Sequence, residues 1–184
     1  MPFFDTEIPG LKIFEPAVFK DDRGYFFESY NTQTWASQGV DTLFVQDNQS
    51  FSHYGVIRGL HYQQNPHAQT KLVRVLKGRI LDVAVDIRKG SPHFGNVYCV
   101  ELSAENKKQL LLPRGFAHGF SVLSETAEVL YKCDAFYSKS TEAGIRFDDP
   151  QLNIDWMIPS GAVIVSEKDK ALPFLSEAQN NFVY

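Results

Sequence analysis

The chain has 184 residues, a length that favours one domain, spanning residues 1–184, over two. Its formal net charge of -4 argues against a broadly basic nucleic-acid-binding surface, and the sequence holds no apolar run of membrane-spanning length. The first residues lack the basic start and apolar core of a signal peptide. These features predict a cytoplasmic globular protein without nucleic-acid or membrane partners.

Short apolar runs separated by turn signals recur along the chain and predict β-strands. In chain order, these runs cover residues 11–19, 25–30, 43–50, 56–60, 71–77, 79–87, 96–102, 109–112, 118–123 and 128–136. One short helix is predicted over residues 32–38, with Gly39 ending it, and the tail after Ser166 is predicted to be helical and polar. Many short strands with so little helix predict an all-β sandwich or barrel.

Side-chain alternation within three of these strands turns polar residues toward the apolar interior. Lys71, His118 and Tyr131 each share a strand face with apolar neighbours. A buried lysine or histidine is costly unless it has partners or a function, so these residues are candidates for a site. Arg58 and His61 differ in parity within one segment, which requires a β-bulge between them or one side chain that points elsewhere.

The two cysteines, Cys99 and Cys133, both lie in apolar runs. This placement favours two buried free thiols in a reducing compartment, with a disulfide as the alternative.

Four side chains could together move a proton beside a carbonyl group. The ordinary pKa of histidine suits His61 to act as a base near neutral pH, and Tyr131 could return a proton from the opposite face. Lys71 could stabilise an oxyanion, and Asp169 could hold His61 in one tautomer. The alternatives are a core histidine, a core tyrosine, a snorkelling lysine at a strand end and a solvated carboxylate.

Three basic side chains, Arg23, Arg58 and Lys168, could bind phosphate groups, since arginine offers a planar fork and lysine a point charge. The alternative is ordinary surface charge. The sequence has neither a glycine-rich phosphate loop nor a dinucleotide-binding fingerprint.

A metal site is disfavoured by one departure from the cupin pattern. The segment from Pro113 to His118 resembles the second cupin motif, which supplies a histidine ligand. The first cupin motif supplies two histidines spaced by one residue, but the matching place here reads His61-Tyr62-Gln63. A conventional site with three histidines and a carboxylate cannot be assembled from these motifs. A metal-dependent cupin oxygenase or isomerase remains an alternative.

Several motifs, in this order and spacing, carry a resemblance to a known family over nearly the whole chain. They are Asp22-Arg23-Gly24-Tyr25-Phe26-Phe27-Glu28, Gln46-Asp47-Asn48, Arg58-Gly59-Leu60-His61-Tyr62-Gln63, Pro113-Arg114-Gly115-Phe116-Ala117-His118-Gly119-Phe120, Tyr131-Lys132 and Ser166-Glu167-Lys168-Asp169. With them, the chain resembles the dTDP-4-dehydrorhamnose 3,5-epimerase family.

The resemblance implies a cupin jelly roll that works as a homodimer without metal or organic cofactor. The implied substrate is a dTDP-linked 4-keto-6-deoxyhexose, and the implied product is a precursor of O-antigen or cell-wall polysaccharide. By position, His61 resembles the proton acceptor, Asp169 its partner, Tyr131 the proton donor and Lys71 the group that stabilises the enolate. The implied substrate-binding positions, including Lys71 and two aromatic residues for the thymine ring, are Phe19, Arg23, Glu28, Gln46, Asp47, Asn48, Arg58, Lys71, His118, Tyr137, Glu142 and Lys168.

One departure from the family pattern lies in the loop after Tyr131. The family often has proline after Tyr-Ser there, whereas Tyr137-Ser138 is followed by Lys139. Two other functions compete with the 3,5-epimerase: an epimerase that acts at C3 or C5 only in a related dTDP-4-keto-deoxysugar pathway, and a non-catalytic sugar-binding cupin. Base, donor and dyad carboxylate together argue against a pure binding protein.

Overall fold

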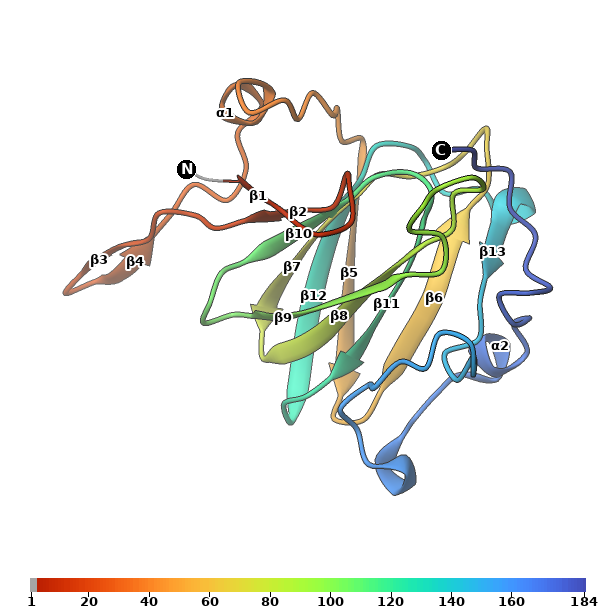
Figure 1. Ribbon diagram of the computed structural model, residues 1–184. Helices are drawn as coiled ribbons and strands as arrows, with labels where there is room; N and C mark the ends of the chain where they lie inside the picture. The colour runs from red at the N-terminus through yellow and green to blue at the C-terminus, as the bar shows by residue number, and fades with distance from the viewer. Residues whose placement is uncertain (1–2) are drawn as a thin grey trace.

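Two antiparallel β-sheets packed face to face form the body of the molecule (Figure 1). The computed structural model describes residues 3–184. The first sheet has the strand order β1 (Phe3–Asp5), β2 (Lys12–Phe14), β10 (Gln109–Leu112), β7 (Lys71–Lys77), β12 (Thr126–Cys133) and β5 (Gln46–His53). The second has the order β13 (Glu142–Gly144), β6 (Ile57–Gln63), β11 (Phe116–Val122), β8 (Arg79–Asp86) and β9 (Val97–Ser103). This architecture confirms the predicted jelly roll of the cupin class.

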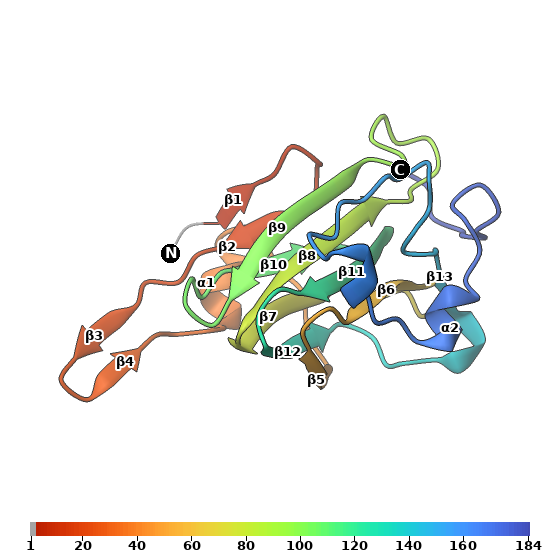
Figure 2. The ribbon, with the colours of Figure 1, turned by 90° about the horizontal axis from the view of Figure 1, so that it is seen from below.

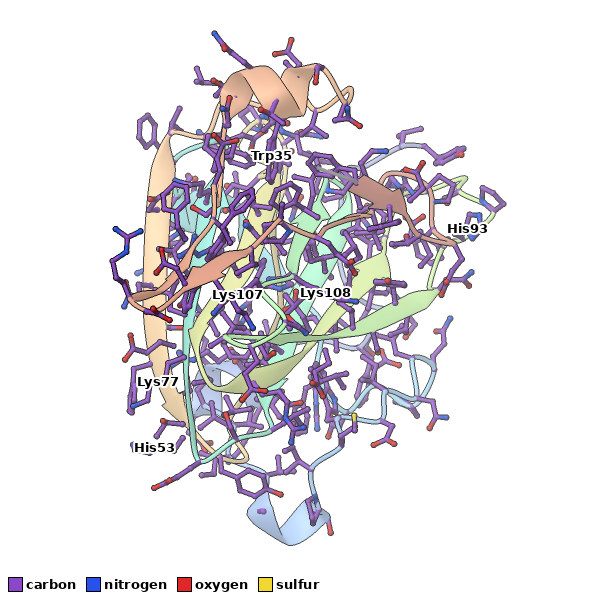
Figure 3. The ribbon with its side chains drawn as sticks, turned by 90° about the vertical axis from the view of Figure 1, so that its left-hand side faces the viewer. Trp35, His53, Lys77, His93, Lys107 and Lys108 are labelled. Carbon is purple, nitrogen blue, oxygen red and sulfur yellow. The ribbon has the colours of Figure 1, made fainter. Side chains whose placement is uncertain are left out.

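The helices are short and lie outside the two sheets. They are α1 (Thr32–Ala36) and α2 (Glu167–Lys170), with single 3-10 turns at Lys139–Thr141 and Ser160–Ala162. Asn31 caps α1 by accepting hydrogen bonds from the backbone N–H groups of Gln33 and Thr34. Trp35 on α1 packs edge-on against Tyr30 and beside Phe14, which fastens the helix to the outer face of the six-stranded sheet (Figure 3).

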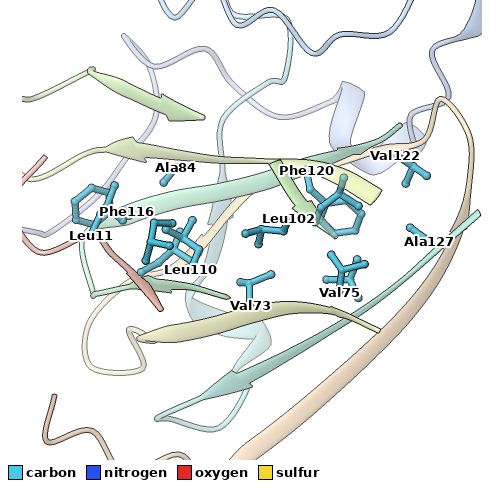
Figure 4. Packing of buried hydrophobic residues seen from close by; sticks show 14 of the residues in the cluster. Leu11, Val73, Val75, Ala84, Leu102, Leu110, Phe116, Phe120, Val122 and Ala127 are labelled. Carbon is cyan, nitrogen blue, oxygen red and sulfur yellow. The ribbon is translucent and has the colours of Figure 1, made fainter. Parts of the chain in front are cut away.

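The main core fills the space between the sheets (Figure 4). Val73 and Val75 point inward from the six-stranded sheet, and Phe116 and Phe120 point inward from the five-stranded sheet. Burying an apolar side chain of this size contributes about 1.5–3 kcal/mol, so this layer holds the sheets together. The chain after β13 covers the outer face of the five-stranded sheet and forms a second apolar cluster there with residues such as Trp156 and Phe182.

A β-bulge interrupts β6, which is one of the two arrangements that the parity of Arg58 and His61 allowed. His118 on β11 pairs with His61, but Phe120 pairs with Arg58, so Gly59 and Leu60 of β6 lie opposite the single residue Gly119 of β11. Gly59 sits inside the bulge at φ +133, and a Cβ atom there would lie 2.5 Å from the Cα atom of Gly119. Only glycine fits this position, and the bulge changes which face His61 presents relative to Arg58.

The predicted strands are confirmed in outline and corrected in detail. Runs 71–77 and 109–112 coincide with β7 and β10 at both ends. One strand over residues 11–19 is wrong: the segment divides into β2 and a later strand, with Pro16 between them, and proline cannot donate to a sheet ladder. The sequence patterns did not predict β1 or β13. The helix predicted over 32–38 ends at Ala36, and only Glu167–Lys170 of the tail is helical.

Both cysteines are free, as predicted, but their environments differ. Cys133 is buried on β12. The prediction that Cys99 is buried is wrong: its neighbours Tyr98 and Val100 pack against the main core, so the side chain of Cys99 points to the other face of β9 and is exposed.

A two-stranded hairpin projects from the body on the side of β1 and β2 (Figures 1 and 2). It consists of β3 (Phe19–Asp21) and β4 (Gly24–Phe26), and all six of these strand residues are exposed. Exposed aromatic rings on so small a hairpin, Phe19, Tyr25 and Phe26 among them, mark it as a surface that another molecule could cover.

Candidate active site

His61 stands at the meeting point of three adjoining hollows at one end of the space between the sheets. The innermost has a volume of about 200 Å³, and its wall includes His61, Lys71, His118 and Tyr131. These side chains come from both sheets: β6 and β11 on one side, β7 and β12 on the other. The structure therefore brings together the predicted base, the predicted donor and the predicted lysine.

Asp169 is the hydrogen-bond partner of His61, as the family resemblance implied. Its Oδ1 lies 2.8 Å from His61 Nε2, and its Oδ2 accepts a hydrogen bond from the backbone N–H of Gly59 at 3.3 Å. Ser166 caps α2 by accepting from the backbone N–H of Asp169, which fixes the carboxylate at the start of the helix. Burial alone would raise the pKa of Asp169, but the hydrogen bond and charge of His61 hold it below its ordinary value.

Lys71 and Tyr131 lie together on the opposite wall. The Lys71 ammonium is 5.8 Å from the centre of the Tyr131 ring. Burial lowers the pKa of Lys71, against the opposing effects of Cys133 and Asp82. Burial also raises the pKa of Tyr131, as does Cys133, whereas the charge of Arg58 lowers it. Near neutral pH, Tyr131 therefore keeps the proton that a donor needs.

His118 forms a second histidine–aspartate pair beside the first. Its Nε2 lies 2.8 Å from Oδ1 of Asp82, and both residues are buried. Burial is the largest effect on the pKa of His118 and lowers it, although Asp82 acts in the opposite direction. His118 is therefore held neutral near pH 7.

The outer hollow carries the residues expected to contact the nucleotide part of a substrate. Gln46, Asn48, Tyr137 and Glu142 line it together with His61. Glu142 accepts a hydrogen bond from the Tyr137 hydroxyl at 3.0 Å and forms an ion pair with Lys168 at 2.6 Å. The hydrogen bond from Lys168 holds the pKa of Glu142 below its ordinary value, so its carboxylate stays charged at the mouth.

Arg58 extends this wall toward the hollow beneath Ser166 and Lys168. Its Nε donates to Ser52 Oγ at 3.0 Å, and its Nη2 donates to the backbone carbonyl of Phe51 at 3.3 Å. These bonds hold the guanidinium at the cavity, where an anionic group could bind beside Lys168.

Four predicted substrate-binding residues do not line this cavity. Asp47 lies on the opposite face of β5 from its neighbours and forms an ion pair with Lys132 at 2.9 Å, because successive strand residues alternate between faces. Phe19 and Arg23 are on the projecting hairpin. Glu28 accepts a hydrogen bond from the side chain of Asn31, next to α1.

The sequence patterns did not predict two residues at the site, Asp82 and Ser50. Asp82 lies in the apolar run 79–87, where a lone carboxylate was a signal in itself. Ser50 lines the innermost hollow, and its hydroxyl has no hydrogen-bond partner within residues 3–184. Its place on the same strand face as Gln46 and Asn48 could have indicated it.

Two structural features bear on the alternative functions. Among residues 3–184, no group of three or more His, Cys, Asp or Glu side chains is arranged to hold a metal ion. Across the same residues, no helix is both long and apolar enough to cross a membrane.

Comparison with known proteins gives consistent matches over the length of the chain. The model of the dTDP-4-dehydrorhamnose 3,5-epimerase family matches residues 5–177. A dTDP-4-dehydrorhamnose 3,5-epimerase from Shigella flexneri is 54% identical over 170 residues, which cover 92% of this chain and 93% of the relative.

Two solved structures add detail to these matches. The 3,5-epimerase of Legionella pneumophila in complex with dTDP-4-keto-L-rhamnose is 48% identical, with a TM-score of 0.91 over 96% of this chain and 93% of that chain. A 3'-monoepimerase from Streptomyces bikiniensis in complex with dTDP-quinovose is 32% identical, with a TM-score of 0.86 over 93% of this chain and 86% of that chain.

Proposed function

We propose that this chain, which belongs to the dTDP-4-dehydrorhamnose 3,5-epimerase family, inverts C3 and C5 of dTDP-4-dehydro-6-deoxy-D-glucose to give dTDP-4-dehydro-L-rhamnose. It is thus an isomerase of dTDP-L-rhamnose biosynthesis. One observation carries the chemistry: the His61–Asp169 pair, the Tyr131 hydroxyl and the Lys71 ammonium face one cavity from two sheets. A base and an acid on opposing walls are what inversion at carbon requires.

The first step is proton removal beside the C4 ketone. The ketone acidifies the hydrogens at C3 and C5, and the neutral ring of His61 takes one of them. Asp169 stabilises the imidazolium that forms, because its carboxylate is already hydrogen-bonded to the ring. The electron pair of the broken C–H bond moves onto the C4 oxygen, and the Lys71 ammonium offsets the charge of the resulting enolate.

The second step returns a proton from the other side. Tyr131 donates its hydroxyl proton to the opposite face of the carbon, so the centre is inverted and a phenolate remains. Arg58 stabilises that phenolate, since its charge lowers the pKa of Tyr131. Transfer of one proton from His61 to Tyr131 through solvent then restores both groups. The sugar must turn before the second centre meets the same base.

The outer hollow would hold the dTDP group away from the reacting carbons. Tyr137 presents an exposed ring on which thymine can stack, and Gln46 and Asn48 offer amides to its edge. Arg58 and Lys168 would bind the diphosphate. Binding energy gathered there positions the sugar over His61 without changing its chemistry.

A homodimer would complete this site. Phe19 and Arg23, which family resemblance assigns to substrate binding, lie on a hairpin that projects from the body of the molecule (Figure 2), and neither lines the cavity of its own chain. A two-fold dimer would let each hairpin reach the cavity of the other subunit. We further propose that the chain acts as one domain in the cytoplasm, where its two free thiols would stay reduced.

The nearest rival is an epimerase that inverts only one centre. The similarity to the 3'-monoepimerase supports this second candidate function, because the same base and donor could serve either reaction. We propose that neither reaction needs a metal. Full activity after treatment with a chelator, with no metal found by elemental analysis, is expected; activity that is lost and restored by a divalent ion would reject this.

The deciding experiment is incubation with dTDP-4-keto-6-deoxyglucose in deuterated water, followed by proton NMR and mass spectrometry. Deuterium at C3 and C5, in a product that a rhamnose-forming reductase accepts, is expected for the 3,5-epimerase. Deuterium at one carbon alone would instead identify a mono-epimerase. Absence of exchange at either carbon would leave only a binding function.

A further inference from the structure

We propose that Asp82 is a positioning residue of the epimerisation: its carboxylate holds the proton of His118 on Nε2 and is a buried counter-charge for the Lys71 ammonium. The inference rests on the proposed function, since it gives His118 and Lys71 distinct parts in binding the sugar. Asp82 lies outside the family motifs, and none of the proton-transfer steps above uses its carboxylate.

Asp82 points into the space between the sheets, beside the reactive end of the cavity. It lies on β8 on the same face as Ile80 and Ala84, which belong to the inner core. Its side chain is 0% exposed, and it is directly opposite Phe120 on β11, two residues from His118 on the same face. A carboxylate in an apolar layer is costly, so its partners must offset that cost.

The first partner is His118. With His118 neutral, the 2.8 Å contact between its Nε2 and Oδ1 of Asp82 requires the ring proton to lie on Nε2, because a carboxylate can only accept. The other ring nitrogen, Nδ1, is then an acceptor. His118 lines the innermost hollow, so Nδ1 can accept a hydrogen bond from a sugar hydroxyl but cannot donate one to the enolate. That leaves Lys71 as the donor to the C4 oxygen.

The second partner is Lys71, which lies on an inward strand face of the opposite sheet. Lys71 enters from β7 on the same face as Val73, a member of the core layer to which Ile80 and Ala84 also belong. Burial lowers the pKa of Lys71, and Asp82 is the carboxylate that opposes this effect. Oδ2 of Asp82 has no hydrogen-bond partner within the described residues, so no hydrogen bond from them neutralises the charge on this oxygen.

The titratable groups around this pair come from five strands. They are His61 on β6, Lys71 on β7, Cys99 on β9, His118 on β11, and Tyr131 and Cys133 on β12. Within the described residues, Asp82 is the one carboxylate whose charge opposes the lowering of the Lys71 pKa by burial, so its removal takes that counter-charge away. The Lys71 pKa should then fall further, and the lysine should lose its proton at a lower pH.

The test compares Asp82→Asn with Asp86→Asn. Both aspartates are fully buried on β8, but Asp86 is held by Arg88 and Ser91 at the far end of the strand. For Asp82→Asn we expect turnover to fall about tenfold or more near neutral pH, and the high-pH limb of the turnover profile to move to lower pH. Binding of dTDP, measured by calorimetry, should change by less than about twofold, because the outer hollow is untouched.

The Asp86→Asn variant should keep the wild-type pH profile even if it unfolds at a lower temperature. Equal shifts in both variants, or a wild-type profile in Asp82→Asn, would overturn the proposal. A wild-type enzyme that exchanges no substrate hydrogen would instead reject the proposed function, so the two failures are distinguishable.

If Asp82→Asn does not fold, a measurement on the wild-type protein can still test whether Asp82 holds the proton of His118 on Nε2. Nitrogen NMR of ring-labelled histidine reports which ring nitrogen carries the proton, and His118→Gln identifies the signal of His118. We expect a neutral ring with the proton on Nε2 at about pH 7.5. A proton on Nδ1, or on both nitrogens, would contradict the assignment to Asp82.

Discussion

The cavity holds two histidine–aspartate pairs with the same contact and different surroundings. In each pair Nε2 lies 2.8 Å from Oδ1 of the aspartate. The side chain of His61 is 35% exposed and that of His118 is 7% exposed. A base must gain and lose protons in each turnover, which requires contact with solvent or substrate. The exposed pair is therefore suited to proton transfer, and the buried pair to a fixed hydrogen bond.

The origin of the two aspartates reinforces this difference. Asp82 comes from the strand next to His118, so the second pair is part of the sheet itself. Asp169 comes from α2, more than a hundred residues after His61, and is anchored by the Gly59 N–H inside the bulge of β6. The register of β8 and β11 therefore brings Asp82 to His118, whereas the path of the C-terminal segment brings Asp169 to His61.

The largest expected effect comes from the same substitution in both histidines. Glutamine can still donate a hydrogen bond to either aspartate, but it cannot take a proton from carbon. We expect His61→Gln to lower turnover by about 10³-fold or more and leave dTDP binding nearly unchanged. For His118→Gln we expect a loss of about tenfold, with a rise in KM, since a binding contact rather than the base is changed.

Steady-state kinetics and calorimetry with dTDP measure both variants. His53→Ala, at an exposed position on β5, is the control and should retain wild-type turnover. Equal losses in the two glutamine variants would remove the distinction between a proton-transferring pair and a fixed pair.

A smaller effect is expected at the donor that faces His61. Tyr131→Phe keeps the ring against Lys71 but removes the hydroxyl proton. Product formation should fall about 10²-fold, while loss of substrate hydrogen to solvent falls much less, because His61 still removes the proton. Both rates can be followed by NMR in deuterated water. If the two rates fell together, Tyr131 would not be the donor.

Next in size is the effect of removing the charge beside His61. Asp169→Asn preserves the shape of the partner but no longer stabilises the imidazolium, so turnover should fall by about 10- to 100-fold. The comparison with Asp82→Asn is informative: the high-pH limb should move only in Asp82→Asn, because the charge of Asp82, and not that of Asp169, opposes the lowering of the Lys71 pKa by burial. A shift of that limb in Asp169→Asn would show that the charge of Asp169 also acts on the pKa of Lys71.

Strand alternation could predict which side chains face the cavity. Once 71–77 is a strand, the face shared by Lys71 and Val73 follows from a period of two, and the same holds for Tyr131 on β12. The rule also shows why Asp47 does not line the cavity: its neighbours Gln46 and Asn48 point inward, so it must point outward. The family motif Gln46-Asp47-Asn48 had been carried over as a unit, whereas alternation divides its members between the two faces of β5.

Long-range contacts lay beyond the sequence patterns. The His61–Asp169 contact depends on the path of the C-terminal segment and on a four-residue helix, which is too short to have a clear signal of its own. Only family resemblance indicated it. Asp82 was visible as a charge in an apolar run, but its partner depended on which strand lies beside β8. Strand order is set by the packing of the whole core, not by any one segment.

The smallest expected effect is on stability in acid. The folded protein holds the pKa of Asp169 below its ordinary value of 3.8, so this carboxylate stabilises the fold at pH values above 3.8. That contribution is lost as the pH falls through the lowered folded-state pKa. We therefore expect Asp169→Asn to lower the melting temperature near pH 6 by about 2–4 °C, the change that about 1 kcal/mol produces in a chain of this size.

The difference between wild type and Asp169→Asn should shrink as the pH is lowered below 3.8, in melting curves followed by circular dichroism. Asp41→Asn, at an exposed position, is the control and should show no pH-dependent difference. A gap that stays constant into acid would mean that Asp169 stabilises the fold through its shape and neutral hydrogen bonds alone. Its charge would then serve only the proton on His61, and the two pairs would differ in catalysis but not in how they support the fold.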